Sequence, residues 1–295
     1  MTQQTTEFIE EKKQEASVST ASDSNGNNGN NNSLSLDNLY ANSHEEVRIP
    51  SNGYIYSQNS GISNKQYVPM KYMTAADEDD LTSPTLLRQG KWLTKILANC
   101  IVLKTIDPDD LLVGDRNALL FWLRQTSYGA NYKLNVTCQN CDCEKKFFSN
   151  DFLLDKLKLK TLDVKPIKSG TNEFSFDLPM SKAKVIFCLL TSKMADELSK
   201  EEEAKANKGV THEKRITSIL KKHIISINGV TDRNQIDKFI DVGMSAKDSL
   251  ALRNYITEIT PDIILKQTAT CPNSGKVQEF DIPIEAQFFL PSAVS

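Results

Sequence analysis

Two cysteine-containing turns, more than a hundred residues apart, place the strongest constraint on how this chain can fold. Cys138-Gln-Asn-Cys141 lies between two strand-like segments, and Cys271-Pro-Asn-Ser274-Gly275 lies between two others near the C-terminus. A zinc ribbon takes two thiolates from each of two such hairpin turns, because the Cys-x-x-Cys spacing lets both sulfurs reach one ion. We therefore expect the two turns to lie side by side and the chain between them to form an insert.

The second turn departs from this pattern, because Ser274 stands where the fourth sulfur belongs. The nearest replacement is Cys143, so the candidate metal ligands are Cys138, Cys141, Cys143 and Cys271. Serine is a poor zinc ligand, and the number of thiolates determines the affinity. The sequence thus leaves two alternatives open: a zinc site completed by Cys143, or an empty relic held by hairpin pairing. We expect no cofactor other than zinc.

Composition and motifs favour a protein without enzymatic activity. The 35 basic and 38 acidic residues nearly balance, which gives no signal for nucleic acid or for an anionic membrane. No apolar run approaches the roughly 20 residues that span a bilayer. Six cysteines without an export signal indicate a reducing compartment. Nucleophile-elbow, phosphate-loop and dinucleotide motifs are absent from the sequence, so we expect neither catalytic residues nor a small-molecule substrate.

The chain divides by composition into two regions. Residues 1–65 include an Asn- and Gly-rich run and offer too little apolar surface to offset the entropy of ordering, which predicts a disordered arm. This arm is either a solvated tail or a segment that folds on a partner. Residues 66–295 are predicted to form a single α+β domain, with zinc-ribbon-like hairpins around a helical insert.

Hydrophobic periodicity predicts the elements of that domain. Asp115 is the expected N-cap of one helix, which Gly129 ends, and Ser245 is the expected N-cap of another. Asn228-Gly229 is a predicted turn. The expected helices cover residues 86–106, 115–128, 151–160, 194–205, 216–227, 236–240 and 245–260. The expected strands cover residues 132–136, 145–149, 174–176, 183–187, 263–267 and 277–284.

Two further features concern single side chains. His223 falls on the apolar stripe of its helix, which favours packing over catalysis. Phe288 and Phe289 follow the last periodic element. They either fold back onto the core or insert into a neighbouring subunit, since exposed aromatic residues commonly anchor interfaces.

Several of these segments, in this order and spacing, resemble the T-even-type myophage baseplate hub proteins and their shorter assembly-factor relatives. The likeness extends from about Leu86 to Pro291. It rests on Gly114-Asp-Arg-Asn117, Tyr132-x-Leu-x-Val-x-Cys-x-x-Cys141, Val185-Ile-Phe-Cys-Leu-Leu-Thr191, Ile227-x-Gly-Val-Thr-Asp232, Asp248-Ser-x-Ala-Leu-Arg-Asn-Tyr-Ile256 and Cys271-Pro-x-x-Gly275.

This resemblance implies a non-enzymatic structural or assembly component of a contractile tail baseplate hub. Its partners would be other phage baseplate and hub proteins, with no nucleic acid and no membrane. It would be located in the tail baseplate of the virion, or in the host cytoplasm during assembly. The alternative is a zinc-ribbon nucleic-acid-binding or transcription factor, which would need a basic stripe beside the cysteine turns. Lys133, Lys145 and Lys146 lie there, but Asp142 and Glu144 interrupt them.

Overall fold

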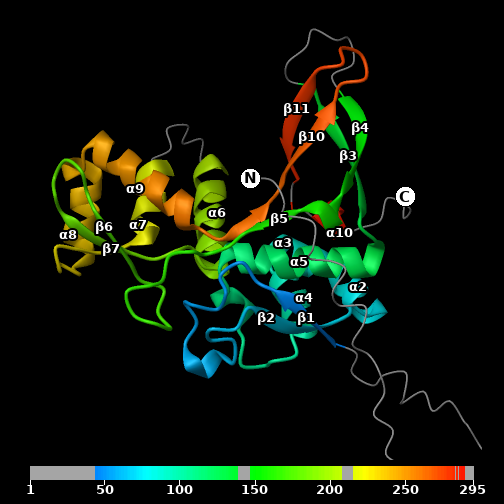
Figure 1. Ribbon diagram of the computed structural model, residues 1–295, viewed down its shortest axis with the longest axis horizontal. Helices are drawn as coiled ribbons and strands as arrows, with labels where there is room; N and C mark the ends of the chain where they lie inside the picture. Colours follow the sequence, from blue (N-terminus) through cyan, green and yellow to red (C-terminus); the bar gives the residue numbers. More distant parts are fainter. Residues whose placement is uncertain (1–43, 139–146, 208–214, 283, 285, 290–295) are drawn as a thin grey trace, which may run out of the picture. The chain divides into compact units, whose positions relative to one another are not determined.

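Short antiparallel strand pairs and helices make up the computed structural model of the protein, which describes residues 44–138, 147–207, 215–282, 284 and 286–289 (Figure 1). The strands are β1 (His44–Arg48), β2 (Tyr67–Lys71), β3 (Asn131–Thr137), β4 (Phe147–Leu153), β5 (Lys158–Lys160), β6 (Phe174–Asp177), β7 (Lys184–Phe187), β8 (Ile224–Ile227), β9 (Asp262–Ile264), β10 (Lys266–Thr270) and β11 (Val277–Asp281). The helices are α2 (Ala75–Thr82), α3 (Pro84–Gln89), α4 (Trp92–Cys100), α5 (Val113–Tyr128), α6 (Ser192–Asn207), α7 (Arg215–His223), α8 (Arg233–Lys238), α9 (Ala246–Ile259) and α10 (Ala286–Phe289). The predicted α+β class is confirmed.

The folded part begins earlier than the sequence predicted. β1 pairs antiparallel with β2, with Val47 opposite Val68, and Ile49, Ile55 and Ile62 are buried in the core. The compact unit starts near residue 42, so the predicted boundary at residue 65 was wrong. Composition misled the prediction because this stretch is rich in Asn, Ser and Gly and its few apolar residues show no regular period. Most of the predicted arm, residues 1–43, lies outside the described residues.

The single helix predicted over residues 86–106 is two helices. α3 ends at Gln89 and is capped by Gly90, whose φ of 64° lies in the left-handed region that favours glycine, and α4 ends at Cys100. Ile101 then bridges to Met70 of β2. The chain turns here because a strand partner is available, which helical periodicity alone cannot indicate.

Two other predicted helices are partly or wholly extended. Residues 151–160 form the end of β4, a 3-10 turn (Leu154–Lys156) and β5. The helix predicted over 216–227 ends at His223, and β8 follows it without a break. β8 completes a three-stranded antiparallel sheet of order β6-β7-β8, so pairing with β7 overrides the helical spacing.

Other local predictions are confirmed. The hairpin of β6 and β7 forms, Asn228 and Gly229 make a turn at positive φ, and Gly129 follows the last residue of α5. Ser245 caps α9 by accepting the Asp248 backbone N–H at 3.0 Å. Asp248 in turn accepts the backbone N–H groups of Met180 and Ser181 at 2.7 and 3.1 Å, which fixes the β6–β7 turn against α9.

The C-terminal aromatic residues fold back onto the core. Phe288 and Phe289 have no exposed surface. The centroid of the Phe288 ring lies 4.7 Å from that of Phe121 and 5.1 Å from that of Tyr132. Phe289 meets Trp92 edge to face at 5.7 Å. Of the two alternatives that the sequence left open, internal packing is the one observed.

Candidate functional site

Four consecutive residues at the start of α5, Gly114 to Asn117, each contact a part of the chain that is distant in sequence. We call them the junction segment. The sequence predicted Asp115 as the N-cap of this helix, and this was wrong: Leu112 is the N-cap and Asp115 lies inside the first helical turn. Contacts with distant parts of the chain, and not the local turn, explain why these residue types stand here.

Gly114 allows the backbone of β9 to approach α5. A Cβ atom at this position would lie 2.0 Å from the carbonyl oxygen of Pro261 and 2.8 Å from the Cα atom of Asp262. Both are backbone atoms, which cannot rotate away as a flexible side chain can. The close contact between α5 and the C-terminal part of the chain therefore requires glycine.

Asp115 connects α5 to the N-terminal segment. Its carboxylate accepts the Ser51 backbone N–H at 2.9 Å and the Tyr56 hydroxyl at 2.5 Å. The same hydroxyl accepts the Leu112 backbone N–H at 3.0 Å. Asp115 is fully buried, and this burial raises its pKa to about 6, although the bonds from Ser51 and Tyr56 favour the charged form.

Arg116 and Asn117 complete the junction. The Arg116 guanidinium forms an ion pair with Asp196 of α6 at 3.0 Å. The Asn117 amide donates to the carboxylate of Asp262 in β9 at 3.2 Å. The junction segment thus links residues 51–56, α6 and the start of β9 to one turn of helix.

Asp115 predicts a specific pH dependence of stability. Its pKa is higher in the folded protein than in the unfolded chain (~3.9), so its favourable contribution is complete below about pH 4 and is lost as the pH rises through about 6. The Asp115→Asn variant lacks this titration. The difference in unfolding free energy between wild type and variant should therefore change by about 3 kcal/mol between pH 4 and pH 7, in favour of the variant at the higher pH.

Urea denaturation of both proteins at several pH values measures this difference, and a difference that stays constant would contradict the assignment. Tyr56→Phe provides a comparison. It removes a hydroxyl that stabilises the charged carboxylate, so the pKa of Asp115 should rise further and the loss of stability should become larger and extend to higher pH.

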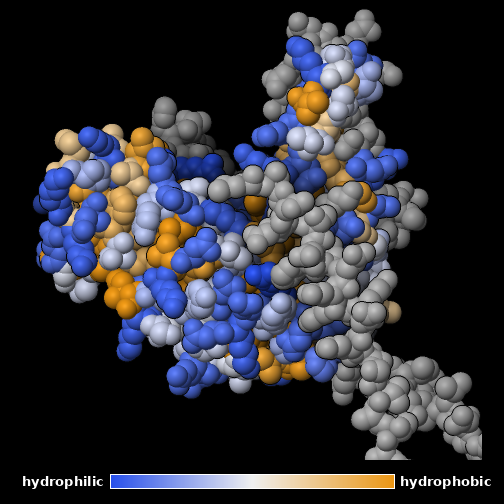
Figure 2. All heavy atoms as spheres, viewed as in Figure 1, coloured by the Kyte–Doolittle hydropathy of each residue, from blue (hydrophilic) through white to orange (hydrophobic). Residues whose placement is uncertain are grey.

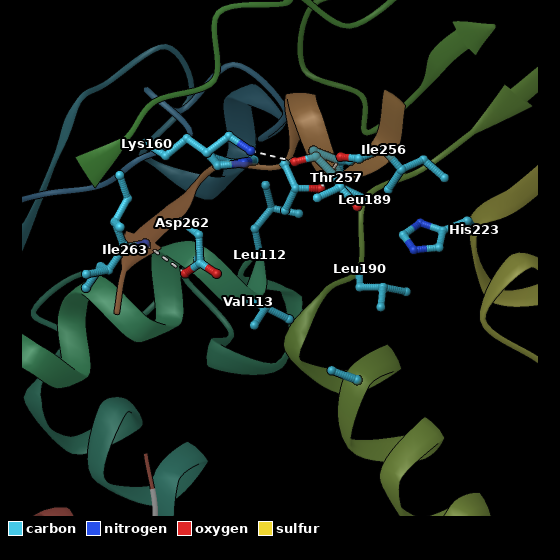
Figure 3. Close-up of a pocket in the computed structure, with 15 residues that line it drawn as sticks. Leu112, Val113, Lys160, Leu189, Leu190, His223, Ile256, Thr257, Asp262 and Ile263 are labelled. Carbon is cyan, nitrogen blue, oxygen red and sulfur yellow. Dashed lines mark hydrogen bonds between the residues drawn. The ribbon is translucent and has the colours of Figure 1, made fainter. Parts of the chain in front are cut away.

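A cavity of about 510 Å³ adjoins the junction segment. In Figure 3, Asp262 and His223 lie on opposite sides of the view, and the aliphatic side chains of Leu112, Val113 and Leu190 lie between them. This cavity was not predicted from the sequence. Its lining residues come from separate elements and share no motif, so the only sequence signal near it was the junction segment itself.

His223 is buried at the edge of this cavity, as its place on the apolar stripe predicted. Its Nδ1 lies 2.6 Å from the Cys188 carbonyl oxygen, and a carbonyl only accepts, so Nδ1 carries the proton and Nε2 remains an acceptor. Burial lowers the pKa of His223, which favours the neutral ring. Asp262 is only partly buried, and desolvation still raises its pKa.

The two cysteine turns belong to hairpins that lie side by side. The Gln278 side chain of β11 donates to Cys138 Sγ, at the end of β3, over 3.0 Å. Gln278 pairs with Ala269 of β10, two residues before Cys271. The strands of the two hairpins are therefore adjacent, as predicted, whereas most of the first turn lies outside the described residues. β3 also has the predicted alternation, with Tyr132 and Val136 buried and Lys133 exposed.

The metal site itself is only partly within the described residues. Cys138 is half-buried and Cys271 is buried, whereas Cys141 and Cys143 lie outside the described part of the chain. Ser274 is exposed, and its hydroxyl accepts the Lys276 backbone N–H at 3.4 Å. Among the described side chains, no three potential ligands come together. The zinc site therefore stays a prediction.

Comparison with known proteins identifies the family. A family model described as T4 bacteriophage base plate protein matches residues 56–290. The chain belongs to this family. The match to the base plate protein family begins at Tyr56, whose hydroxyl binds Asp115, and it includes the junction segment, the cavity and both cysteine turns. No curated protein and no solved structure matches the chain. Within the part of the chain that the structure describes, no helix combines the length and apolar character needed to cross a membrane.

Proposed function

We propose that the protein is a non-enzymatic structural or assembly component of the hub of a contractile phage tail baseplate. The observation that carries this proposal is the family match over residues 56–290. The protein acts through contacts with other baseplate proteins, either in the tail of the virion or in the host cytoplasm during assembly. Nothing in the family assignment favours the nucleic-acid-binding alternative.

Apolar side chains exposed among polar ones on the surface (Figure 2) support a role in protein contacts. Val242 and Val277 are 78% and 65% exposed, and Met180 is 58% exposed. Met180 lies in the turn that Asp248 fixes through two backbone N–H groups, so the backbone at Met180 is held in place before any partner binds. Preformed apolar anchors of this kind lower the entropic cost of association.

The experiment that tests the proposal is purification of the tagged native protein from infected cells, followed by mass spectrometry and sedimentation of the complexes. We expect co-purification with baseplate proteins at an assembly stage. Finding the protein in finished particles as well would indicate a resident component, whereas finding it only in intermediates would indicate an assembly factor. Partners confined to nucleic acid or to the transcription apparatus would refute the proposal.

We further propose that Cys138, Cys141, Cys143 and Cys271 bind one zinc ion. The adjacency of the two hairpins supports this, because it brings Cys138 close to the hairpin that carries Cys271. In this site zinc would crosslink the hairpins and stabilise the fold, as structural zinc does in other ribbons.

Elemental analysis of the purified protein should give about one zinc per chain, or none if the site is a relic. If zinc is present, Cys143→Ser should lower the occupancy, and Ser274→Cys should raise it in that background. Cys188→Ala, at a cysteine beside His223, is the matched control and should leave the zinc content unchanged. A stoichiometric redox metal would contradict the proposal, and unchanged occupancy in Cys143→Ser would exclude that residue as a ligand.

A further inference from the structure

A second hollow lies next to the cavity beside the junction segment. The second hollow, of about 410 Å³, shares Lys160 and Ile264 with the first. We call the two together the β9 groove. Two neighbouring hollows that share lining residues suit an extended chain segment, whose successive side chains can enter separate hollows.

The walls of the groove are held in place without an occupant. The Val113 backbone N–H donates to the Leu190 carbonyl oxygen at 3.3 Å, and Leu112 bridges to Thr191. On the other side, the Lys160 ammonium donates to the Thr257 carbonyl oxygen and so ties β5 to α9. An occupant would therefore meet a preformed surface, which reduces the cost of binding.

The floor of the groove is apolar. Leu112, Val113, Leu190, Ile256 and Ile263 line the first hollow, and Leu159 and Ile259 line the second. Two aliphatic side chains, Val164 and Ile264, remain 36% and 43% exposed at this surface. Such a surface favours apolar side chains of a partner, because contact removes apolar area from water.

The groove carries more negative than positive charge. Its lining includes three carboxylates, on Asp163, Glu258 and Asp262, against one ammonium, on Lys160. That ammonium is already bound to the Thr257 carbonyl oxygen, and Arg116, near Asp262, is paired with Asp196. His223 is neutral and offers an acceptor. The polar groups available to an occupant thus favour hydrogen-bond donors and positive charge.

We propose that the β9 groove binds an extended segment of a partner protein in which apolar residues alternate with lysine or arginine. This rests on the proposed function, and it specifies which surface makes a baseplate contact and what kind of segment fits it. One apolar side chain fills the cavity beside the junction segment. The basic side chains reach Asp262 and the exposed carboxylates of Asp163 and Glu258.

The test uses two pools of synthetic nonapeptides. Both have Leu, Ile, Val or Phe at alternate positions, and the remaining positions are Lys or Arg in one pool and Asp or Glu in the other. Fluorescence anisotropy with the full-length protein should show the basic pool binding at least about tenfold more tightly than the acidic pool, with weakening as salt rises. Equal binding of both pools, or no binding of the basic pool, would overturn the proposal.

Three variants locate the binding. Ala195→Phe places a large side chain in the cavity and should lower the affinity for the basic pool about tenfold. The double variant Asp163→Lys/Glu258→Lys changes only exposed positions, so it should fold normally and should lower the same affinity by a similar factor at low salt. Glu279→Lys, an exposed residue of β11, is the matched charge control and should have no effect.

Unchanged affinity in the double lysine variant would overturn the assignment of the site. If the wild type dimerises and Ala195→Phe makes it a monomer in sedimentation, the occupant is a second copy of the chain, and the proposed partner is wrong. Failure of the peptide test with continued co-purification of baseplate proteins would refute this inference alone. If baseplate proteins do not co-purify with the wild-type protein, the proposed function itself is refuted.

Discussion

Replacing Phe288 and Phe289 together by alanine is expected to unfold most of the protein at physiological temperature. Both rings are fully buried, and they contact Phe121, Tyr132 and Trp92 as well as each other. A buried Phe→Ala change costs about 3–5 kcal/mol. Two such changes approach the total stability of a typical domain, about 5–15 kcal/mol, although neighbouring sites are not strictly additive.

The backbone around these rings amplifies the effect. Arg124 of α5 donates from Nε to the Phe288 carbonyl oxygen at 2.7 Å and from Nη1 to the Gly129 carbonyl oxygen at 2.8 Å. If the C-terminal segment detaches, the buried guanidinium loses an acceptor, and an unsatisfied donor adds about 1–3 kcal/mol.

Thermal and urea denaturation followed by circular dichroism measure this loss. Val242→Ala is the control, because Val242 is 78% exposed and its truncation should change the stability by less than about 0.5 kcal/mol. An unchanged melting temperature in the double alanine variant would show that these rings do not pack in the core.

Gly114→Ala is expected to cause the second large loss of unfolding free energy. The added Cβ would lie 2.0 Å from the Pro261 carbonyl oxygen, so α5 and the start of β9 must separate. Overpacking against a rigid backbone costs about 3 kcal/mol or more. The separation would also stretch the bond from Asn117 to Asp262 and distort the β9 groove.

Gly90→Ala is the matched control for this prediction. No atom lies within 4 Å of a Cβ at Gly90, so the substitution adds only the strain of its φ of 64°, about 1–2 kcal/mol. Urea denaturation should therefore show Gly114→Ala as the less stable of the two variants. Equal stability would mean that the contact at Pro261 is easily relieved.

Local sequence signals predicted the elements that depend on neighbouring residues. The alternation of Tyr132, Leu134 and Val136 predicted β3, and Ser245 was recognised as the cap of α9. The turn at Asn228 and Gly229 was predictable for the same reason, because these residue types readily adopt a positive φ. The order of motifs was also sufficient to place the chain in its family.

Segments whose conformation depends on a distant partner were predicted wrongly. Ile224–Ile227 continues a helical pattern, but it is a strand because β7 provides a pairing edge. Lys158–Lys160 is extended because β9 lies beside it, more than a hundred residues away in sequence. Short strands such as these have weak intrinsic preferences, so the partner decides.

By itself, the sequence determined the α+β class, the cap of α9, the turn at Asn228-Gly229 and the adjacency of the two cysteine hairpins. Only the tertiary structure decided that residues 44–65 belong to the core and that Asp115 is a buried acceptor rather than a cap. The β9 groove likewise exists only in the folded chain. The physical reason is the same in each case: burial, close packing and desolvation are properties of residues brought together from distant parts of the chain, and no local pattern encodes them.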